Sequence, residues 1–130
     1  PIKTPKLQKA WKPDIIDLPS RDSILDALRL IALNNNRAVI VLDKKEVIGI
    51  VSEGDIIRSL LKNEKISSPL SKIMNKSFKF LTKDNRSVAL RYFKKHTVSL
   101  LPVVDKKMRV MDIITLKDIL KGSFTWVDKI

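Results

Sequence analysis

The chain of 130 residues is long enough for one compact domain or two small interlocked ones, and 44% hydrophobic residues suffice to fill a real core. It contains no Cys, which excludes disulfides, thiolate nucleophiles and zinc thiolate sites and suits a cytoplasmic location. The 26 Lys and Arg residues outnumber the 14 Asp and Glu residues, and the net charge of +12 favours an anionic partner such as a nucleotide, nucleic acid or anionic lipid. No apolar stretch approaches the ~20 residues that cross a bilayer, so we expect no membrane insertion.

At the N-terminus, residues 1–9 are predicted to form a basic arm. Lys3, Lys6 and Lys9 of this arm, with Lys12 just after it, recur at three-residue spacing beside Trp11. Clustered lysines can bind nucleic-acid phosphates by electrostatic attraction that weakens as salt is added. No motif for reading the grooves of a duplex accompanies them. The arm is therefore interpreted first as a linker and second as a nucleic-acid-binding arm.

Apolar periodicity and turn residues predict the same elements twice along the chain. A first helix follows Asp22, which is a suitable N-cap, and ends at the asparagine run 34–36. Two strands and a second helix are expected at residues 38–42, 47–51 and 54–61. After a polar linker at 63–69 and a helical turn at 70–74, the second set is expected at 84–95, 99–104, 109–114 and from Leu116 onward.

Internal similarity indicates that this second set is a duplicate of the first. Three segments recur in the same order at offsets of 62, 62 and 63 residues: Asp22–Leu28 as Asp84–Leu90, Val41–Asp43 as Val103–Asp105, and Ser52–Ile56 as Thr115–Ile119. Each unit has an apolar sheet face that it cannot cover alone. We therefore predict an α/β (α+β) fold in which two helix–strand–strand–helix repeats pack sheet to sheet about a pseudo-twofold axis.

The junction between the second strand and second helix of the first repeat carries the most specific chemistry. The Ser52 hydroxyl and the free N–H groups of the first helical turn point at one spot, which is a ready anion site. Asp55, in the same turn, can accept hydrogen bonds from two neighbouring hydroxyls such as a ribose presents, and Gly49 has no side chain to crowd a ligand. The alternative is that Ser52 and Asp55 only cap the helix.

These residues resemble a known family. The run Gly49-Ile50-Val51-Ser52-Glu53-Gly54-Asp55 is similar to the motif of the cystathionine beta-synthase (CBS) domain, which is Gly, two apolar residues, Ser or Thr, two variable residues and Asp. Leu101–Asp105 and Thr115–Asp118 resemble the same family in the second repeat. The resemblance covers about residues 10–122 and identifies a tandem pair, or Bateman module, with repeats at 10–66 and 67–122 and a tail at 123–130.

The resemblance implies a non-catalytic regulatory module that binds an adenine nucleotide (AMP, ADP or ATP) in the clefts between its repeats. It requires no cofactor and would control a fused or partner enzyme or transporter. A homodimer is also implied, through helical faces that carry Ile56, Ile57, Leu60, Ile119 and Leu120.

The family's binding residues carry over to two clefts. In the first, Ser52 and Asp55 would hold the ribose and phosphates while the base lies against the second repeat, at Phe80, Leu81, Thr82, Thr97, Val98, Ser99 and Leu100. In the second, Thr115 and Asp118 would face Ile15, Ile16, Arg37, Ala38 and Val39. Arg37 could hold a phosphate or simply end a turn in solvent. Asp112 stands where the first repeat has Gly49, so like-charge repulsion predicts a weak or empty second site.

Other functions are less well supported by the residues. An enzyme is not expected, because the chain has one His, His96, no Gly-rich phosphate loop and no ligand set with metal spacing. A nucleic-acid-binding basic module and a ligand-free dimerisation module remain the alternatives.

Overall fold

The structure, a computed structural model, describes residues 17–34 and 36–120. The N-terminal arm, Ile15, Ile16 and the tail at 123–130 lie outside the described residues, so the predictions made for them are not addressed. No helix in the described part of the chain is both long and apolar enough to cross a membrane.

The first repeat contains a three-stranded sheet and two helices. Strand β1 (Asp17–Leu18) pairs in parallel with β2 (Ala38–Asp43), and β2 pairs antiparallel with β3 (Glu46–Ser52). Helix α3 (Ile24–Asn34) connects β1 to β2, and α4 (Glu53–Leu61) follows β3 directly.

The second repeat has the same order of elements. The 3-10 helix η1 (Leu70–Lys72) leads from the first repeat to α5 (Arg86–Lys95). Strands β4 (Leu100–Val104) and β5 (Val110–Thr115) form an antiparallel pair, and residues 116–120 are helical. Leu81 bridges Val103 in parallel, so it occupies the place that β1 has in the first repeat.

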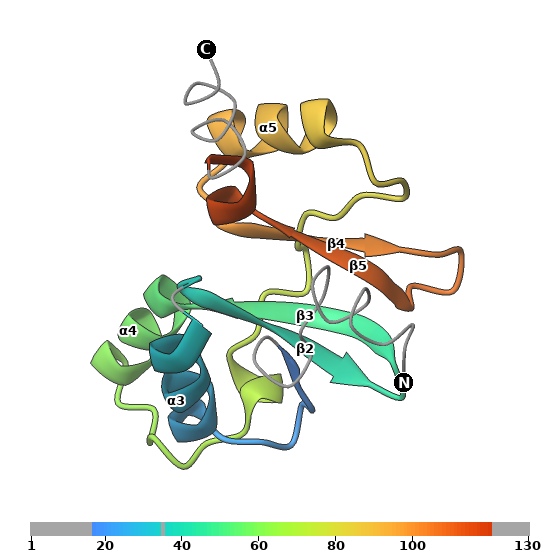
Figure 1. Cartoon of the computed structure of the whole chain (residues 1–130). Helices are drawn as coiled ribbons and strands as arrows, with labels where there is room; N and C mark the ends of the chain where they lie inside the picture. Colours follow the sequence, from blue (N-terminus) through green and yellow to red (C-terminus); the bar gives the residue numbers. More distant parts are fainter. Residues whose placement is uncertain (1–16, 35, 121–130) are drawn as a thin grey trace.

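The elements form four layers in the order helix–sheet–sheet–helix (Figure 1). Helices α3 and α4 form one outer layer, and α5 lies in the other. Three buried clusters fill the spaces between the layers. The outer clusters lie under the helices of each repeat, and the central cluster lies between the sheets and takes residues from both: Ala38, Ile40, Val47, Leu100, Val104 and Ile113. The predicted sheet-to-sheet packing is therefore confirmed.

Both antiparallel pairs contain a register shift at the equivalent place. It falls between Val41 and Leu42 in β2 and between Val103 and Val104 in β4. Because successive strand residues point to opposite faces, the shift resets which side chains point inward. A shared irregularity at an offset of 62 residues is what duplication of one unit would leave.

Two helices begin one or two residues later than the sequence pattern indicates. The cap of α3 is Ser23 rather than Asp22: its Oγ accepts the Asp26 N–H at 3.2 Å, and Asp26 accepts the Ser23 N–H at 3.0 Å. Helix α5 begins at Arg86, with Asn85 accepting the Val88 N–H at 3.1 Å. In both places two adjacent residues could cap a helix, and composition does not distinguish between them.

Gly49 is buried against Met74, which follows η1. A Cβ on Gly49 would stand 2.8 Å from the Met74 sulfur and 3.0 Å from its Cβ. The partner of Gly49 across the sheet is Val41, which belongs to the cluster under α3. The glycine therefore leaves room for Met74, which differs from the role in ligand access that the sequence motif implies.

We expect Gly49→Ala to lower the free energy of unfolding by about 1–3 kcal/mol, because the added methyl overpacks this contact. Chemical denaturation measures the change. Met74→Ala in the same chain should recover part of the loss, since it removes the atoms that the methyl meets. A double variant that loses the sum of the two single losses would contradict this explanation.

Candidate functional site

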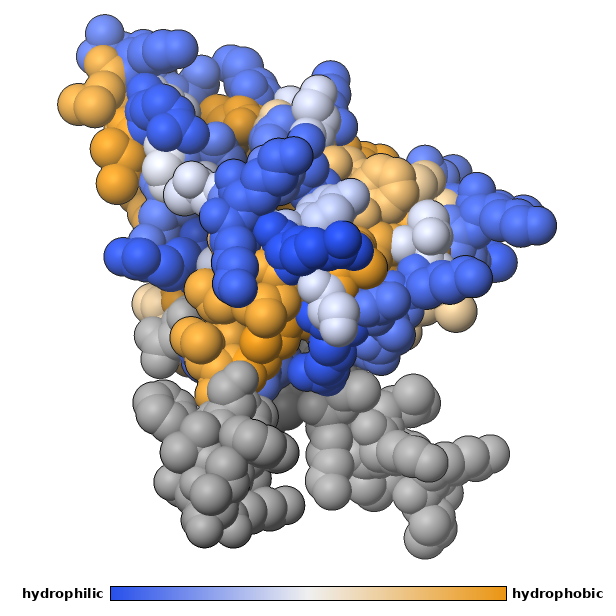
Figure 2. Space-filling model, turned by 90° about the horizontal axis from the view of Figure 1, so that it is seen from above, coloured by the Kyte–Doolittle hydropathy of each residue, from blue (hydrophilic) through white to orange (hydrophobic). Residues whose placement is uncertain are grey.

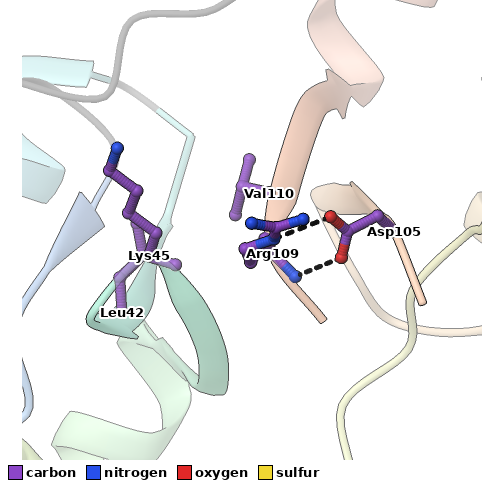
Figure 3. A pocket seen from close by; sticks show the side chains of 5 residues that line it. All are labelled: Leu42, Lys45, Asp105, Arg109 and Val110. Carbon is purple, nitrogen blue, oxygen red and sulfur yellow. Dashed lines mark hydrogen bonds and ion pairs between the residues drawn. The ribbon is translucent and has the colours of Figure 1, made fainter. Parts of the chain in front are cut away.

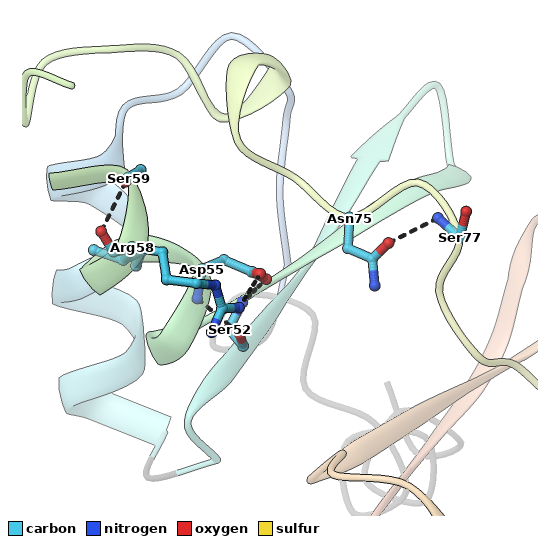
Figure 4. A network of polar contacts seen from close by, with 7 residues as sticks. Ser52, Asp55, Arg58, Ser59, Asn75 and Ser77 are labelled. Atoms are coloured by element: carbon cyan, nitrogen blue, oxygen red, sulfur yellow. Dashed lines mark hydrogen bonds and ion pairs between the residues drawn. The ribbon is translucent and has the colours of Figure 1, made fainter. Parts of the chain in front are cut away.

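The N-terminus of α4 is closed by a reciprocal pair of hydrogen bonds. Ser52 Oγ accepts the Asp55 N–H at 3.1 Å, and Asp55 Oδ2 accepts the Ser52 N–H at 2.9 Å (Figure 4). The arrangement is a capping box, which satisfies two of the backbone donors at the start of the helix. The capping role of Ser52 and Asp55, held open by the sequence, is therefore present in the structure.

Two arginines surround this helix start. Arg58 Nη2 donates to Asp55 Oδ1 at 2.9 Å, and Arg37 Nε donates to Glu53 Oε1 at 3.1 Å. Both arginine side chains are more than half exposed. Arg37, assigned to the second cleft by the resemblance, thus directs its guanidinium to the helix start of the first repeat. The positive φ of 63° at Arg37 accompanies this turn.

The second repeat repeats the geometry in part. Thr115 Oγ1 accepts the Asp118 N–H at 3.0 Å, as Ser52 does for Asp55. In each repeat the first helical N–H also bonds to the residue before the first long strand. Glu53 N–H donates to the Arg37 carbonyl at 3.0 Å, and Leu116 N–H donates to the Ser99 carbonyl at 2.9 Å.

The two repeats meet beside these helix starts. The Ser99 hydroxyl donates a short hydrogen bond to the Asn36 carbonyl, and Lys117 Nζ donates to the Asn34 carbonyl at 3.4 Å. Asn34 Oδ1 in turn accepts the Asn36 N–H at 2.7 Å. Lys117, in the turn between Thr115 and Asp118, therefore contacts Asn34 of the first repeat, while the part of Arg37 and Ala38 in a site stays a prediction.

The residues predicted to receive the base differ in exposure. Thr82 and Thr97 are exposed, while Leu81 is buried in the cluster under α5 and Val98 packs against it. Phe80 is 37% exposed and lies 5.8 Å from the ring of Phe78. Among the described contacts, none joins Thr82 or Thr97 to Ser52, so their part in a site stays a prediction.

Asp112 lies on the outer face of its sheet. Its strand partner is Val103 of the cluster under α5, whereas Ile113, the next residue, belongs to the central cluster. Burial raises the pKa of Asp112, the hydrogen bond from the Ile113 N–H and the charge of Arg86 oppose this rise, and the negative charges of Asp84 and Asp118 add to it.

A segment not singled out in the sequence runs along the edge of β3. Asn75 exchanges two backbone hydrogen bonds with Ile50, at 3.1 and 2.8 Å, two residues before Ser52. Its Oδ1 accepts the Ser77 N–H at 2.9 Å, which closes a tight turn after the bridge to β3 (Figure 4). The Asn-x-Ser run is the sequence signal for such a turn.

Comparison with known proteins agrees with this architecture. The CBS domain pattern matches residues 12–62 and 70–124. An inosine-5'-monophosphate dehydrogenase from Aquifex aeolicus is 31% identical over 101 residues, which cover 75% of this chain and 20% of that protein. The chain spans only 20–26% of the length of the curated relatives it matches.

Solved structures give the same result. The protein named AcuB from Vibrio cholerae is 25% identical with a TM-score of 0.76, covering 87% of this chain and 85% of that one. The CBS domain pair of protein MJ0100, solved with 5'-methylthioadenosine and S-adenosyl-L-methionine, is 26% identical with a TM-score of 0.69, covering 87% and 94%. With two matched repeats, two equivalent capped helix starts and a shared central layer, the chain belongs to the CBS domain family as a tandem pair.

Proposed function

We propose that the chain is a regulatory module that senses an adenine nucleotide in the clefts between its repeats. The observation that carries the proposal is the matched pair of helix starts, Ser52–Asp55 and Thr115–Asp118. Asn34, which belongs to the first repeat, accepts a hydrogen bond from Lys117 at the second of these starts. The similar MJ0100 pair was solved with two adenosine-containing ligands, which supports the class of compound.

The contacts at Asp55 suggest how a nucleotide would enter the first cleft. Asp55 Oδ2 is held by the Ser52 N–H, whereas Oδ1 is held by Arg58, whose side chain is 66% exposed. An exposed ion pair contributes little, so Arg58 exchanges partners readily. Moving to a phosphate, it would leave Asp55 Oδ1 to accept a ribose hydroxyl and would gain a bidentate partner.

The first cleft is proposed to bind more tightly than the second. Arg58 and Arg37 both lie at its helix start, whereas the second start has Lys117, which donates to the Asn34 carbonyl, and is preceded in β5 by the carboxylate of Asp112. The ranking made from the sequence, which already rested on the negative charge of Asp112, is kept as a proposal.

Titration tests the proposal directly. AMP, ATP, S-adenosylmethionine and a short duplex DNA are each added to the chain and followed by calorimetry and thermal melting. We expect an adenosine ligand to stabilise the fold by about 2.7 kcal/mol when present at 100 times its dissociation constant. Salt-sensitive binding of DNA alone would favour the nucleic-acid alternative, and the absence of any response would favour a ligand-free structural module.

Self-association remains part of the proposal, with a corrected surface. Ile56 is 1% exposed and belongs to the core under α3, so it is not available to a partner. The apolar side chains exposed on α3 and α4 are Leu33, Ile57, Leu60 and Leu61. We propose that a second copy covers them. Of the residues predicted from the second repeat, Leu120 is 50% exposed, and this face of the molecule has apolar patches among hydrophilic side chains (Figure 2).

A further inference from the structure

A cavity lies at the opposite end of the sheets from the capped helix starts. It has a volume of about 370 Å³ and is lined by Leu42, Lys45, Asp105, Arg109 and Val110 (Figure 3). Leu42 and Lys45 belong to the β2–β3 hairpin of the first repeat, and the other three residues belong to the β4–β5 hairpin of the second. A cavity of this size falls within the range that small-molecule sites occupy.

The two hairpins are joined beside the cavity by backbone hydrogen bonds. Val47 N–H donates to the Met108 carbonyl at 2.8 Å, and Val110 N–H donates to the Lys45 carbonyl at 3.3 Å. The walls are therefore held by the backbone of both repeats, and the cavity does not depend on side chains alone for its shape.

The charges of the cavity favour an anion. Both carboxylate oxygens of Asp105 are hydrogen-bonded within the β4–β5 hairpin. Oδ1 accepts hydrogen bonds from the backbone N–H groups of Lys107 and Arg109 at 2.8 and 2.9 Å, and Oδ2 accepts one from Arg109 Nε at 2.9 Å. These bonds, that of the Arg109 N–H above all, lower the pKa of Asp105. Within residues 17–34 and 36–120, Arg109 pairs with Asp105 through Nε alone and Lys45 forms no ion pair, which leaves the terminal N–H groups of Arg109 and the Lys45 ammonium to a ligand.

The backbone around the cavity is unfavourable for its residues. Lys44 and Lys45, the two central residues of the β2–β3 turn, have φ of 53° and 68°, and Met108 has φ of 64°. Two-residue turns of this kind favour Asn and Gly, because side chains other than these are disfavoured at positive φ. Lysine at both positions places positive charge at the edge of the cavity but makes the turn less stable than Asn or Gly would. Backbone strain of this kind is concentrated at functional sites.

We propose that this cavity binds a small organic anion with an apolar body, its acidic group between Lys45 and Arg109 and its apolar part against Leu42 and Val110. The site is separate from the nucleotide clefts. A bound anion contacts both hairpins and so stabilises their packing against each other. Neither the family motif nor the proposed nucleotide binding requires it.

Phenyl phosphate is a suitable probe, and backbone amide NMR of the whole chain is the measurement. In the presence of saturating AMP, which occupies the clefts if they bind it, we expect saturable shifts at Leu42, Lys45 and Val110 with a dissociation constant in the millimolar range, ordinary for a probe of this size. Inorganic phosphate and benzyl alcohol should each bind more weakly. Phosphate can contact only the cationic side chains, and benzyl alcohol only the apolar ones.

Lys45→Gly separates binding from folding. It relieves the positive φ, so the melting temperature should rise by about 3–6 °C, while phenyl phosphate should bind about fivefold more weakly. Lys44→Gly is the matched control: it relieves the neighbouring φ and removes the same charge, but Lys44 does not line the cavity. It should raise the melting temperature and leave the affinity unchanged.

Three results would overturn the proposal. Equal weakening by the two glycine variants would show only general attraction to a basic surface. If benzyl alcohol or inorganic phosphate bound as tightly as phenyl phosphate, the site would not recognise an acidic group and an apolar body together. Shifts confined to Ser52, Asp55 and their neighbours would place the probe in the nucleotide cleft.

Discussion

Ile40→Ala is expected to lower the free energy of unfolding by about 2–5 kcal/mol, the range for removing a buried aliphatic side chain without refilling the space. Ile40 is fully buried, and its cluster contains residues from both sheets. The lost contacts therefore belong to the interface between the repeats as much as to either repeat. Urea denaturation followed by circular dichroism measures the change.

Leu61→Ala provides the control for this prediction. Leu61 is 78% exposed in the described chain, and its truncation should change the free energy by no more than about 0.5 kcal/mol when the protein is held monomeric by dilution. If the Ile40 variant lost as little, the central layer would not be packed as described. A second, separate transition in the Ile40 variant would show that the repeats had become independent.

Asp55→Ala should remove nearly all the stabilisation that an adenosine ligand gives, about 2.7 kcal/mol at 100 times the dissociation constant. It should also lower the stability of the unliganded chain by about 1 kcal/mol, because it opens the capping box with Ser52. The sequence alone leads to the expectation that the unliganded fold is nearly unaffected, and the capping box corrects it. Thermal melting with and without AMP separates the two effects.

Asp26→Ala is a matched control, since Asp26 closes an equivalent capping box with Ser23 at the start of α3. Near neutral pH Asp26 is ionised, its pKa being lowered by the hydrogen bond from the Ser23 backbone, and its removal should cause a similar loss in the unliganded chain. The gain from AMP should remain. An equal loss of that gain in both variants would reduce Asp55 to a capping residue.

The fold was predictable because its two main signals are local and repeated. Helical spacing after Ser23 and the apolar runs of β2 and β4 define the elements, and the offset of 62 residues pairs them. The individual caps were not predictable, because neighbouring Asp, Ser and Asn residues are chemically interchangeable there.

The site was predictable at its motif and less so around it. Ser52, Asp55 and Thr115 lie where the motif implies, since strand and helix are joined without a loop. The surroundings of Gly49 and Asp112 depend on which face of the sheet each occupies, and the register shift in each strand pair sets that face. Arg58 could have been noticed as the residue one helical turn after Asp55.

The central layer also bears on how such a chain could arise. Its members occupy corresponding places in the two halves, as with Ala38 and Leu100, so each half supplies one side of a self-complementary contact. A polypeptide of half this length would expose that surface and could bury it only against a second molecule related by a twofold axis. Gene fusion would turn this subunit interface into an internal one and, by joining the halves, free each of them to diverge, as Gly49 and Asp112 have done.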